Sequence, residues 1–163
     1  MKKFRFAPIL ALFLSVAMLS ACGGASNSAN ARSNANRPGE NPNAPKTNVE
    51  ELGLLVNIPY EAEDIVWKGG LQQKKVLAVL RFSTEDSKKL IADAEKVGVG
   101  EAASIAVETW FPDELTAQGD MSGDGMLKGS TYQATTFYQE PFISGKVTRI
   151  EGTDYFVLEM TAK

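Results

Sequence analysis

Residues 75–98 read KVLAVLRFSTEDSKKLIADAEKVG, and this stretch decides the fold. Its first part, 75–82, is apolar at consecutive positions, which is typical of a central strand covered on both faces. Ser83 or Thr84 then supplies a helix N-cap, and two acidic residues follow in the first turn. Apolar residues recur at helical spacing up to a glycine, so we expect a helix over about 84–97.

Apolar runs on both sides of this stretch predict further strands. The expected strands span 52–58, 65–68, 104–111, 131–138, 143–150 and 154–161. Residues 151–154 form the turn of the last hairpin. The sequence therefore predicts an α+β domain over 49–163, an antiparallel sheet of about six strands with one helix packed on one face.

The first 21 residues have the composition of an export signal. A basic start with Lys2, Lys3 and Arg5 precedes an apolar stretch that is shorter than the roughly 20 residues needed to span a bilayer. Leu19-Ser20-Ala21-Cys22 comes next. One interpretation of residues 1–22 is an ordinary secretory signal that happens to end in Ala-Cys. The last four residues also allow a more specific interpretation.

Leu19-Ser20-Ala21-Cys22 resembles the lipobox of bacterial lipoproteins. The resemblance implies that residues 1–21 are a signal peptide removed by cleavage, and that Cys22 carries a diacylglyceryl group and usually an additional acyl chain such as palmitate. Several acyl chains together anchor a protein stably to a membrane. Gly23 follows the cysteine, and in bacteria with two membranes the resemblance implies the outer membrane, facing the periplasm.

Residues 23–48 contain no Val, Ile, Leu, Met or aromatic residue. Such a segment cannot offset the entropy of folding, so we expect residues 22–48 to be the lipidated cysteine and a disordered tether. The prolines of its second half favour a domain that stands off the membrane. Without the three basic residues of the signal, the mature chain has 14 basic and 20 acidic residues, a formal charge of -6. This charge disfavours nucleic acid as a partner.

The chain has no histidine and a single cysteine. This composition excludes histidine-based catalysis, histidine-ligated metals and an internal disulfide. Paired acids such as Glu63-Asp64 and Asp113-Glu114 are adjacent in sequence, so in an extended chain they point to opposite faces. We therefore expect a protein that is not an enzyme and that has no cofactor, with calcium as the one exception to consider.

Asp120, Ser122 and Asp124 place oxygen ligands at alternate positions before Gly125, as at the start of an EF-hand-like calcium loop. The match is partial, because Thr131 occupies the twelfth position, where a bidentate glutamate is expected. The alternative is a mobile glycine-rich loop without a metal.

Four aromatic residues are candidates for binding. Trp110 and Phe111 stand before a proline and two acids, and Trp110 is either an exposed anchor or a residue packed on a second covered face. Tyr132 and Tyr138 share strand parity in the predicted strand, where they could stack on sugar rings or form ordinary cross-strand pairs.

Two functions fit this sequence. The first is a non-catalytic, lipid-anchored envelope protein that acts as an accessory or interaction module for another envelope protein, and it predicts an apolar patch or an unpaired sheet edge. The alternative is a lipoprotein that binds a small ligand or glycan on its aromatic residues, and it predicts a concave pocket.

Overall fold

The computed structural model describes residues 41 and 43–163, so the predicted signal, the predicted lipobox and most of the predicted tether lie outside the described residues. Six strands form one antiparallel sheet: β1 (Ala62–Gly70), β2 (Lys75–Phe82), β3 (Glu101–Ala106), β4 (Met126–Gln133), β5 (Phe142–Ile150) and β6 (Tyr155–Ala162). The helices are α1 (Val49–Gly53), α2 (Thr84–Glu95), α3 (Asp113–Ser122) and a short 3₁₀ helix, η1 (Thr135–Phe137). The predicted α+β class is confirmed.

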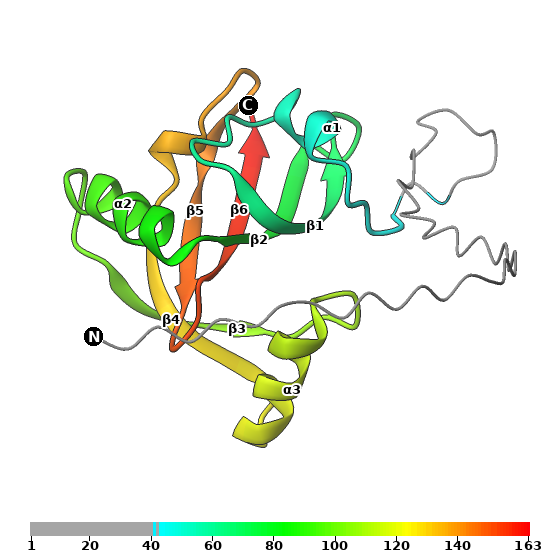
Figure 1. Ribbon diagram of the computed structural model, residues 1–163. Helices are drawn as coiled ribbons and strands as arrows, with labels where there is room; N and C mark the ends of the chain where they lie inside the picture. The colour runs from blue at the N-terminus through cyan, green and yellow to red at the C-terminus, as the bar shows by residue number, and fades with distance from the viewer. Residues whose placement is uncertain (1–40, 42) are drawn as a thin grey trace, which may run out of the picture. The chain divides into compact units, whose positions relative to one another are not determined.

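The strand order across the sheet is β1-β2-β6-β5-β4-β3. β1 and β2 form a hairpin, α2 carries the chain to the far edge, and the chain returns from β3 to β6 until β6 pairs with β2 (Figure 1). This connection makes β1 and β3 the two edges of the sheet. Edge strands matter for function because they can expose unpaired backbone groups.

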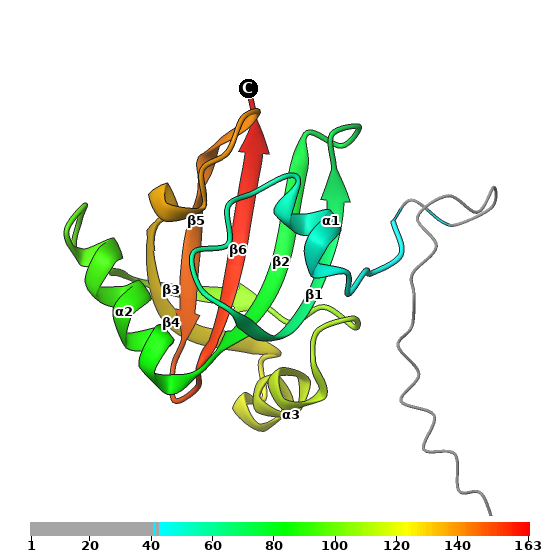
Figure 2. The same cartoon turned by 45° about the horizontal axis from the view of Figure 1, so that its top comes forward.

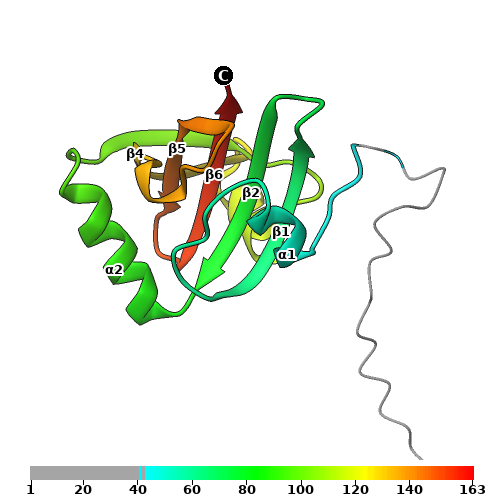
Figure 3. The same cartoon turned by 90° about the horizontal axis from the view of Figure 1, so that it is seen from above.

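The predicted helix over 84–97 is present as α2. The Ser83 side chain accepts a hydrogen bond from the backbone N–H of Asp86 at 3.1 Å, and Leu90 is fully buried. α2 lies over one face of the sheet, and α1 lies over the same face (Figure 3). The sequence placed this helix correctly because its cap and its apolar spacing are both local signals.

The sheet carries a hydrophobic cluster on each face. The first core cluster lies under α2 and includes Trp67, Ala78, Leu80, Leu90, Phe137 and Phe156. The second core cluster lies on the opposite face and includes Val79, Phe111, Leu115, Leu127, Ile150 and Val157. Neighbouring residues of β2 enter different clusters, which confirms that this strand is covered on both faces.

The strand predicted over 52–58 is wrong, because the segment begins within α1. The side chain of Asn48 caps this helix by accepting a hydrogen bond from the backbone N–H of Glu51 at 2.8 Å. Leu52 and Val56 are both fully buried in the first core cluster. Their spacing of four residues fits one face of a helix as well as the alternation of a strand, which misled the prediction.

Residues 113–122 form α3, so the predictions of a single helix and of a glycine-rich loop from residue 120 are wrong here. Asp113 and Glu114 occupy the first turn, and Leu115 is buried in the second core cluster. The strand predicted over 104–111 is displaced to β3, and Phe111 lies in the segment that leads to α3.

The strand predicted over 131–138 ends earlier, at Gln133, and η1 follows it. Tyr132 therefore lies on β4, whereas Tyr138 follows η1 and lies on no strand. The shared strand parity of these two tyrosines was a wrong prediction.

Ordered packing begins before residue 49. Lys46 pairs with Trp67 of β1 through two backbone hydrogen bonds of 2.8 Å each. The indole N–H of Trp67 also donates to the carbonyl of Asn48 at 3.1 Å. Residues 46–48 thus pack on β1, just before the predicted boundary at residue 49.

Candidate functional site

The two edges of the sheet differ in how they are protected. On β1, the segment around Lys46 pairs with the strand, the register shifts between Ala62 and Asp64, and two glycines end the strand. Each of these features hinders further strand pairing. β3 lies at the other edge of the sheet.

The backbone hydrogen bonds around β3 show which of its groups face outward. The N–H of Val107 donates to the carbonyl of Gly125 at 3.0 Å, and the register pairs Ile105 with Leu127. In an antiparallel pair the bonded positions alternate with positions whose backbone groups point away. Odd-numbered residues of β3 therefore bond to β4, and Ala102, Ser104 and Ala106 direct their N–H and C=O groups outward.

A second hydrogen bond confirms this direction. Ser104 is paired with Lys128 of β4, and the carbonyl of Lys128 accepts from the N–H of Glu151 at 2.9 Å, on the side away from β3. Among the described residues, no backbone hydrogen bond is found from Ala102, Ser104 or Ala106 to a group beyond this edge. We call these outward groups the open edge.

The side chains of β3 leave the open edge accessible. Ala102, Ser104 and Ala106 are exposed, and Glu101 is the one charged residue in the strand. The strand has no lysine or proline, and its register with β4 has no bulge. Apart from Glu101, β3 thus has none of the lysines, prolines and bulges that usually prevent edge-to-edge association.

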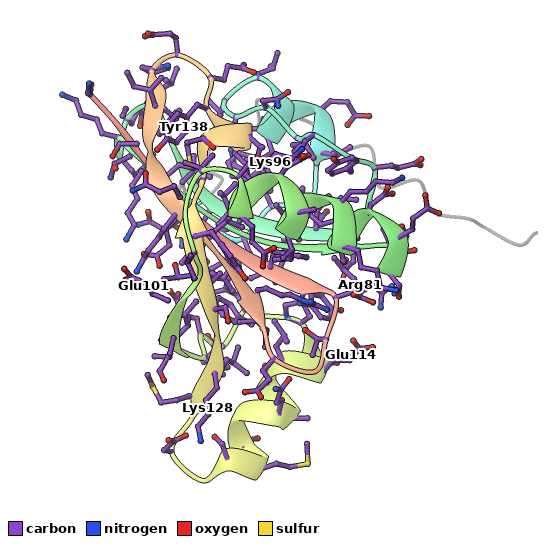
Figure 4. The ribbon with its side chains drawn as sticks, turned by 90° about the vertical axis from the view of Figure 1, so that its left-hand side faces the viewer. Arg81, Lys96, Glu101, Glu114, Lys128 and Tyr138 are labelled. Atoms are coloured by element: carbon purple, nitrogen blue, oxygen red, sulfur yellow. The ribbon has the colours of Figure 1, made fainter. Side chains whose placement is uncertain are left out.

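A hollow of about 280 Å³ borders the open edge. It is lined by Ala102, Ala103, Ser104, Lys128, Gly129 and Glu151. Figure 4 shows Glu101 at the beginning of β3 and Lys128 on neighbouring β4. Small side chains on the strand and two opposite charges beside it can receive one side chain of a strand added to this edge.

Trp110 and Phe111 lie away from Tyr132 and Tyr138, the other two aromatic residues that the sequence suggested for binding. Phe111 is buried, and Trp110 is half-buried against the second core cluster. The ring of Trp110 packs edge-on against Phe111 with centroids 4.9 Å apart, and Lys68 Nζ lies 4.9 Å from its centroid. Its indole N–H donates to the exposed Glu108. Trp110 is therefore mainly a packing residue of the second cluster.

Tyr132 and Tyr138 both pack partly against the first core cluster, so they do not form a single platform with Trp110. Each lines a hollow, one of about 250 Å³ beside Tyr132 and one of about 430 Å³ beside Tyr138. Gln133, Gly145 and Lys146 line both. The two tyrosines thus border adjoining open hollows, and Figure 4 shows Tyr138 at the end of the molecule away from α3.

The predicted calcium ligands are spread over a helix end and a turn. Asp120 and Ser122 belong to α3, whereas Asp124 follows the helix. The hydroxyl of Ser122 donates to Asp124 at 2.6 Å, and the N–H of Met126 donates to the same carboxylate at 3.0 Å. The bond from Ser122, followed by that from Met126, lowers the pKa of Asp124.

Within the described part of the chain, no three or more Asp, Glu, Cys or His residues are grouped to hold a metal. Asp124 uses its carboxylate to close the turn after α3. Calcium binding by Asp120, Ser122 and Asp124 stays a prediction, and no step of the proposed function depends on it.

A polar junction joins α3 to the sheet. The guanidinium of Arg81 lies 3.5 Å from Glu63 and 3.8 Å from Glu114 of α3. It also lies over the ring of Tyr155, 5.6 Å from the ring centroid. Figure 4 shows Arg81 and Glu114 where α3 meets the sheet. The Tyr155 hydroxyl donates to Asp64 at 3.4 Å. Burial, together with the neighbouring Glu114 carboxylate, raises the pKa of Tyr155 to about 12. This junction holds α3 in place.

Comparison with known protein families, curated proteins and solved structures finds no match for this chain. In the residues that the structure describes, no helix is long and apolar enough to cross a membrane. The candidate site therefore depends on the geometry of the sheet alone. Sequence reasoning missed Ala102, Ser104 and Ala106, because small residues give little periodicity and only the strand order identifies β3 as an edge.

Proposed function

We propose that this chain is a non-catalytic, lipid-anchored protein of the bacterial envelope whose domain binds an extended segment of another envelope protein along the open edge. One observation carries the proposal: among the described residues, the outward backbone groups of Ala102, Ser104 and Ala106 have no hydrogen-bond partner, and the edge has no proline, lysine or bulge. An extended segment that adds to a sheet gains affinity from main-chain hydrogen bonds and specificity from side-chain pockets.

The lipobox supports the anchored part of this proposal. Cys22 lies 24 positions before Lys46, which pairs with β1 of the folded domain. A chain of this length, with the composition of a tether, gives the domain a reach of about 25 to 30 Å. A membrane-tethered binding module therefore meets its partner at a high effective concentration, so a modest edge interaction suffices.

Ser104 provides the experiment that tests the edge. Ser104→Pro removes one outward N–H, and it leaves the β3–β4 ladder intact because this residue does not bond to β4. We expect about ten-fold weaker recovery of the crosslinked envelope partner from cells. Ser104→Ala keeps the N–H, and we expect it to recover the partner as the unmodified protein does.

Thermal unfolding of both variants serves as the folding control. Equal recovery by Ser104→Pro, Ser104→Ala and the unmodified chain would place the partner elsewhere on the surface. Loss of recovery in both variants, with both folded, would show that the Ser104 side chain is recognised and not the backbone.

A second candidate function rests on the adjoining hollows beside Tyr132 and Tyr138. Their lining residues Gln133, Ser144 and Lys146 offer polar groups next to an aromatic ring, which suits a sugar. Titration of the chain with soluble envelope glycan fragments tests this function. Saturable binding that Tyr138→Ala weakens and Ser104→Pro does not change would favour it over edge binding.

A further inference from the structure

A hollow of about 440 Å³ lies between α1 and the turn of the β1–β2 hairpin. Leu54, Leu55, Trp67 and Leu71 contribute its apolar lining. Leu54 and Leu71 are 76% and 59% exposed, so two large apolar side chains project into solvent on either side of one hollow. Exposed apolar side chains that line one hollow form a more extended apolar surface than a single exposed residue does, and extended apolar surfaces mark contact sites.

The hairpin that carries Leu71 is basic. Residues 65–84 contain four basic residues and no acidic residue, although the mature chain as a whole is acidic. Lys74 and Lys75, three and four positions after Leu71, are exposed. On the other side of the hollow, Glu51 is paired with Lys46, so the exposed Glu50 is the remaining carboxylate of α1 and offsets only part of this charge.

The chain reaches the folded domain at the same place. Lys46 lines the hollow and pairs with Trp67 of β1, and the predicted lipid anchor precedes it in sequence. The turn of the β1–β2 hairpin and the C-terminus lie at one end of the domain, and α1 lies over the sheet beside β1 (Figure 2). The Lys74 carbonyl accepts the N–H of Ala162, which brings the terminal Lys163 to this end as well.

The acidic groups of the polar junction lie on other parts of the fold. Glu63 and Asp64 begin β1, at the opposite end of that strand from the hairpin turn, and Glu114 belongs to α3. The exposed Glu140 lies nearer, because the carbonyl of the adjoining Pro141 accepts the N–H of Lys163, so Glu140 and Glu50 offset part of the positive charge of Lys74 and Lys75.

From these observations we propose that the end formed by α1 and the β1–β2 turn rests on an anionic phospholipid surface, with Leu54 and Leu71 inserted among the headgroups. Lys74 and Lys75 pair with lipid phosphates beside them. Apolar side chains flanked by lysines suit the membrane interface, because the lysines stay with the headgroups while the leucines enter the apolar layer. This inference differs from the stand-off position that the tether composition predicts, and it does not depend on the open edge.

Fluorophore scanning on vesicles tests the proposal. The mature chain carries a hexahistidine tag in place of the lipid at position 22, and vesicles with nickel-chelating lipid hold it as the anchor would. With Cys22 replaced the chain has no cysteine, so an environment-sensitive fluorophore can be attached at one introduced cysteine. The labelled variants are Leu54→Cys and Leu71→Cys, with Val99→Cys and Met121→Cys as controls, because these are also exposed apolar residues, at 90% and 81%.

On phosphatidylglycerol vesicles we expect a blue shift and quenching by brominated lipid for the labels at 54 and 71, and neither for those at 99 and 121. Replacing Lys74 or Lys75 by glutamine should weaken the association of the untethered chain with these vesicles by about five-fold each. Labels at all four positions that behave as they do in water would overturn the proposal. Equal shifts at all four positions, or equal shifts on phosphatidylcholine, would also overturn it.

Discussion

Trp110 is half-buried, its ring packs edge-on against Phe111, and Lys68 lies over the ring. We predict that Trp110→Ala lowers the free energy of unfolding by about 2 kcal/mol, roughly half the cost for a fully buried tryptophan. Trp67→Ala, which empties a fully buried site, should cost about 3 to 5 kcal/mol. Urea denaturation measures both.

Partner recovery separates the two roles that the sequence allowed for Trp110. The packing role predicts that Trp110→Ala recovers the partner as well as the unmodified chain does. An unchanged stability together with lost recovery would show instead that Trp110 is the binding anchor.

Tyr155 makes the stability of the fold dependent on pH at the alkaline end. Its pKa is raised to about 12, chiefly by burial, whereas a tyrosine in an unfolded chain titrates near about 10. Below about pH 10 the hydroxyl is neutral in both states, so its contribution is fully present. Above that pH the unfolded chain loses the proton first, and stability falls until about pH 12.

We predict that the melting temperature falls less steeply between about pH 10 and about pH 12 in Tyr155→Phe than in the unmodified chain. The comparison is needed because the pKa values of Tyr60 and Lys89 are also raised, by hydrogen bonds to Asp93 and to Glu85 respectively. Thermal unfolding at a series of pH values measures the difference. Parallel curves for the two proteins would show that the Tyr155 hydroxyl does not resist ionisation.

At the scale of elements, two serines near the start of α2 are expected to affect stability differently when each is replaced by alanine. Ser83→Ala removes the N-cap hydrogen bond to Asp86, and we predict a loss of about 1 kcal/mol. Ser87 is fully buried, and its hydroxyl has no hydrogen-bond partner among the described residues, so Ser87→Ala should leave stability unchanged or raise it. Urea denaturation of both variants checks this, and a larger loss for Ser87→Ala than for Ser83→Ala would contradict it.

The sequence predicted well those elements whose signals are local. β2 has the predicted bounds, α2 was found from its cap and spacing, and the last hairpin has the predicted turn at 151–154. α1 and α3 were missed because each is short and its apolar residues also fit another pattern. Leu115 is the main apolar signal of α3, and its burial depends on the second core cluster, which forms only when distant strands meet.

The sequence predicted the type of candidate site but not its position in the chain. An unpaired sheet edge was one of the two expected features of an interaction module, but the residues that form it were not identified. β3 consists mostly of alanines and a serine, so it lacks the contrast between apolar and polar faces that marks a strand. The prediction placed the strand too late in the sequence because it included Trp110 and Phe111. These two residues belong to the connection between β3 and α3.

For the whole molecule, the boundary of the folded domain leads to a prediction about truncation. A chain that begins at residue 41 keeps the pairing of Lys46 with Trp67 and the contact of Asn48 with the Trp67 indole. A chain that begins at residue 49 loses both, and we predict that it melts at a lower temperature. Calorimetry of the two chains measures the difference, and equal melting temperatures would support the predicted boundary at residue 49.

Membrane contact and partner binding are assigned to two surfaces on different elements. α1 and the β1–β2 turn would face the membrane, and β3, at the other edge of the sheet, would receive the partner. Each surface has its own variants, so the failure of one proposal leaves the other intact.

The central claim is that the backbone of β3 pairs with a strand of the partner, and amide hydrogen exchange tests it most directly. In the free chain, we expect fast exchange at Ala102, Ser104 and Ala106, and slow exchange at Ala103 and Ile105, which bond to β4. In the purified complex, exchange at the three outward amides should slow while the other two stay slow. Outward amides that are already slow in the free chain, or that stay fast in the complex, would contradict the account.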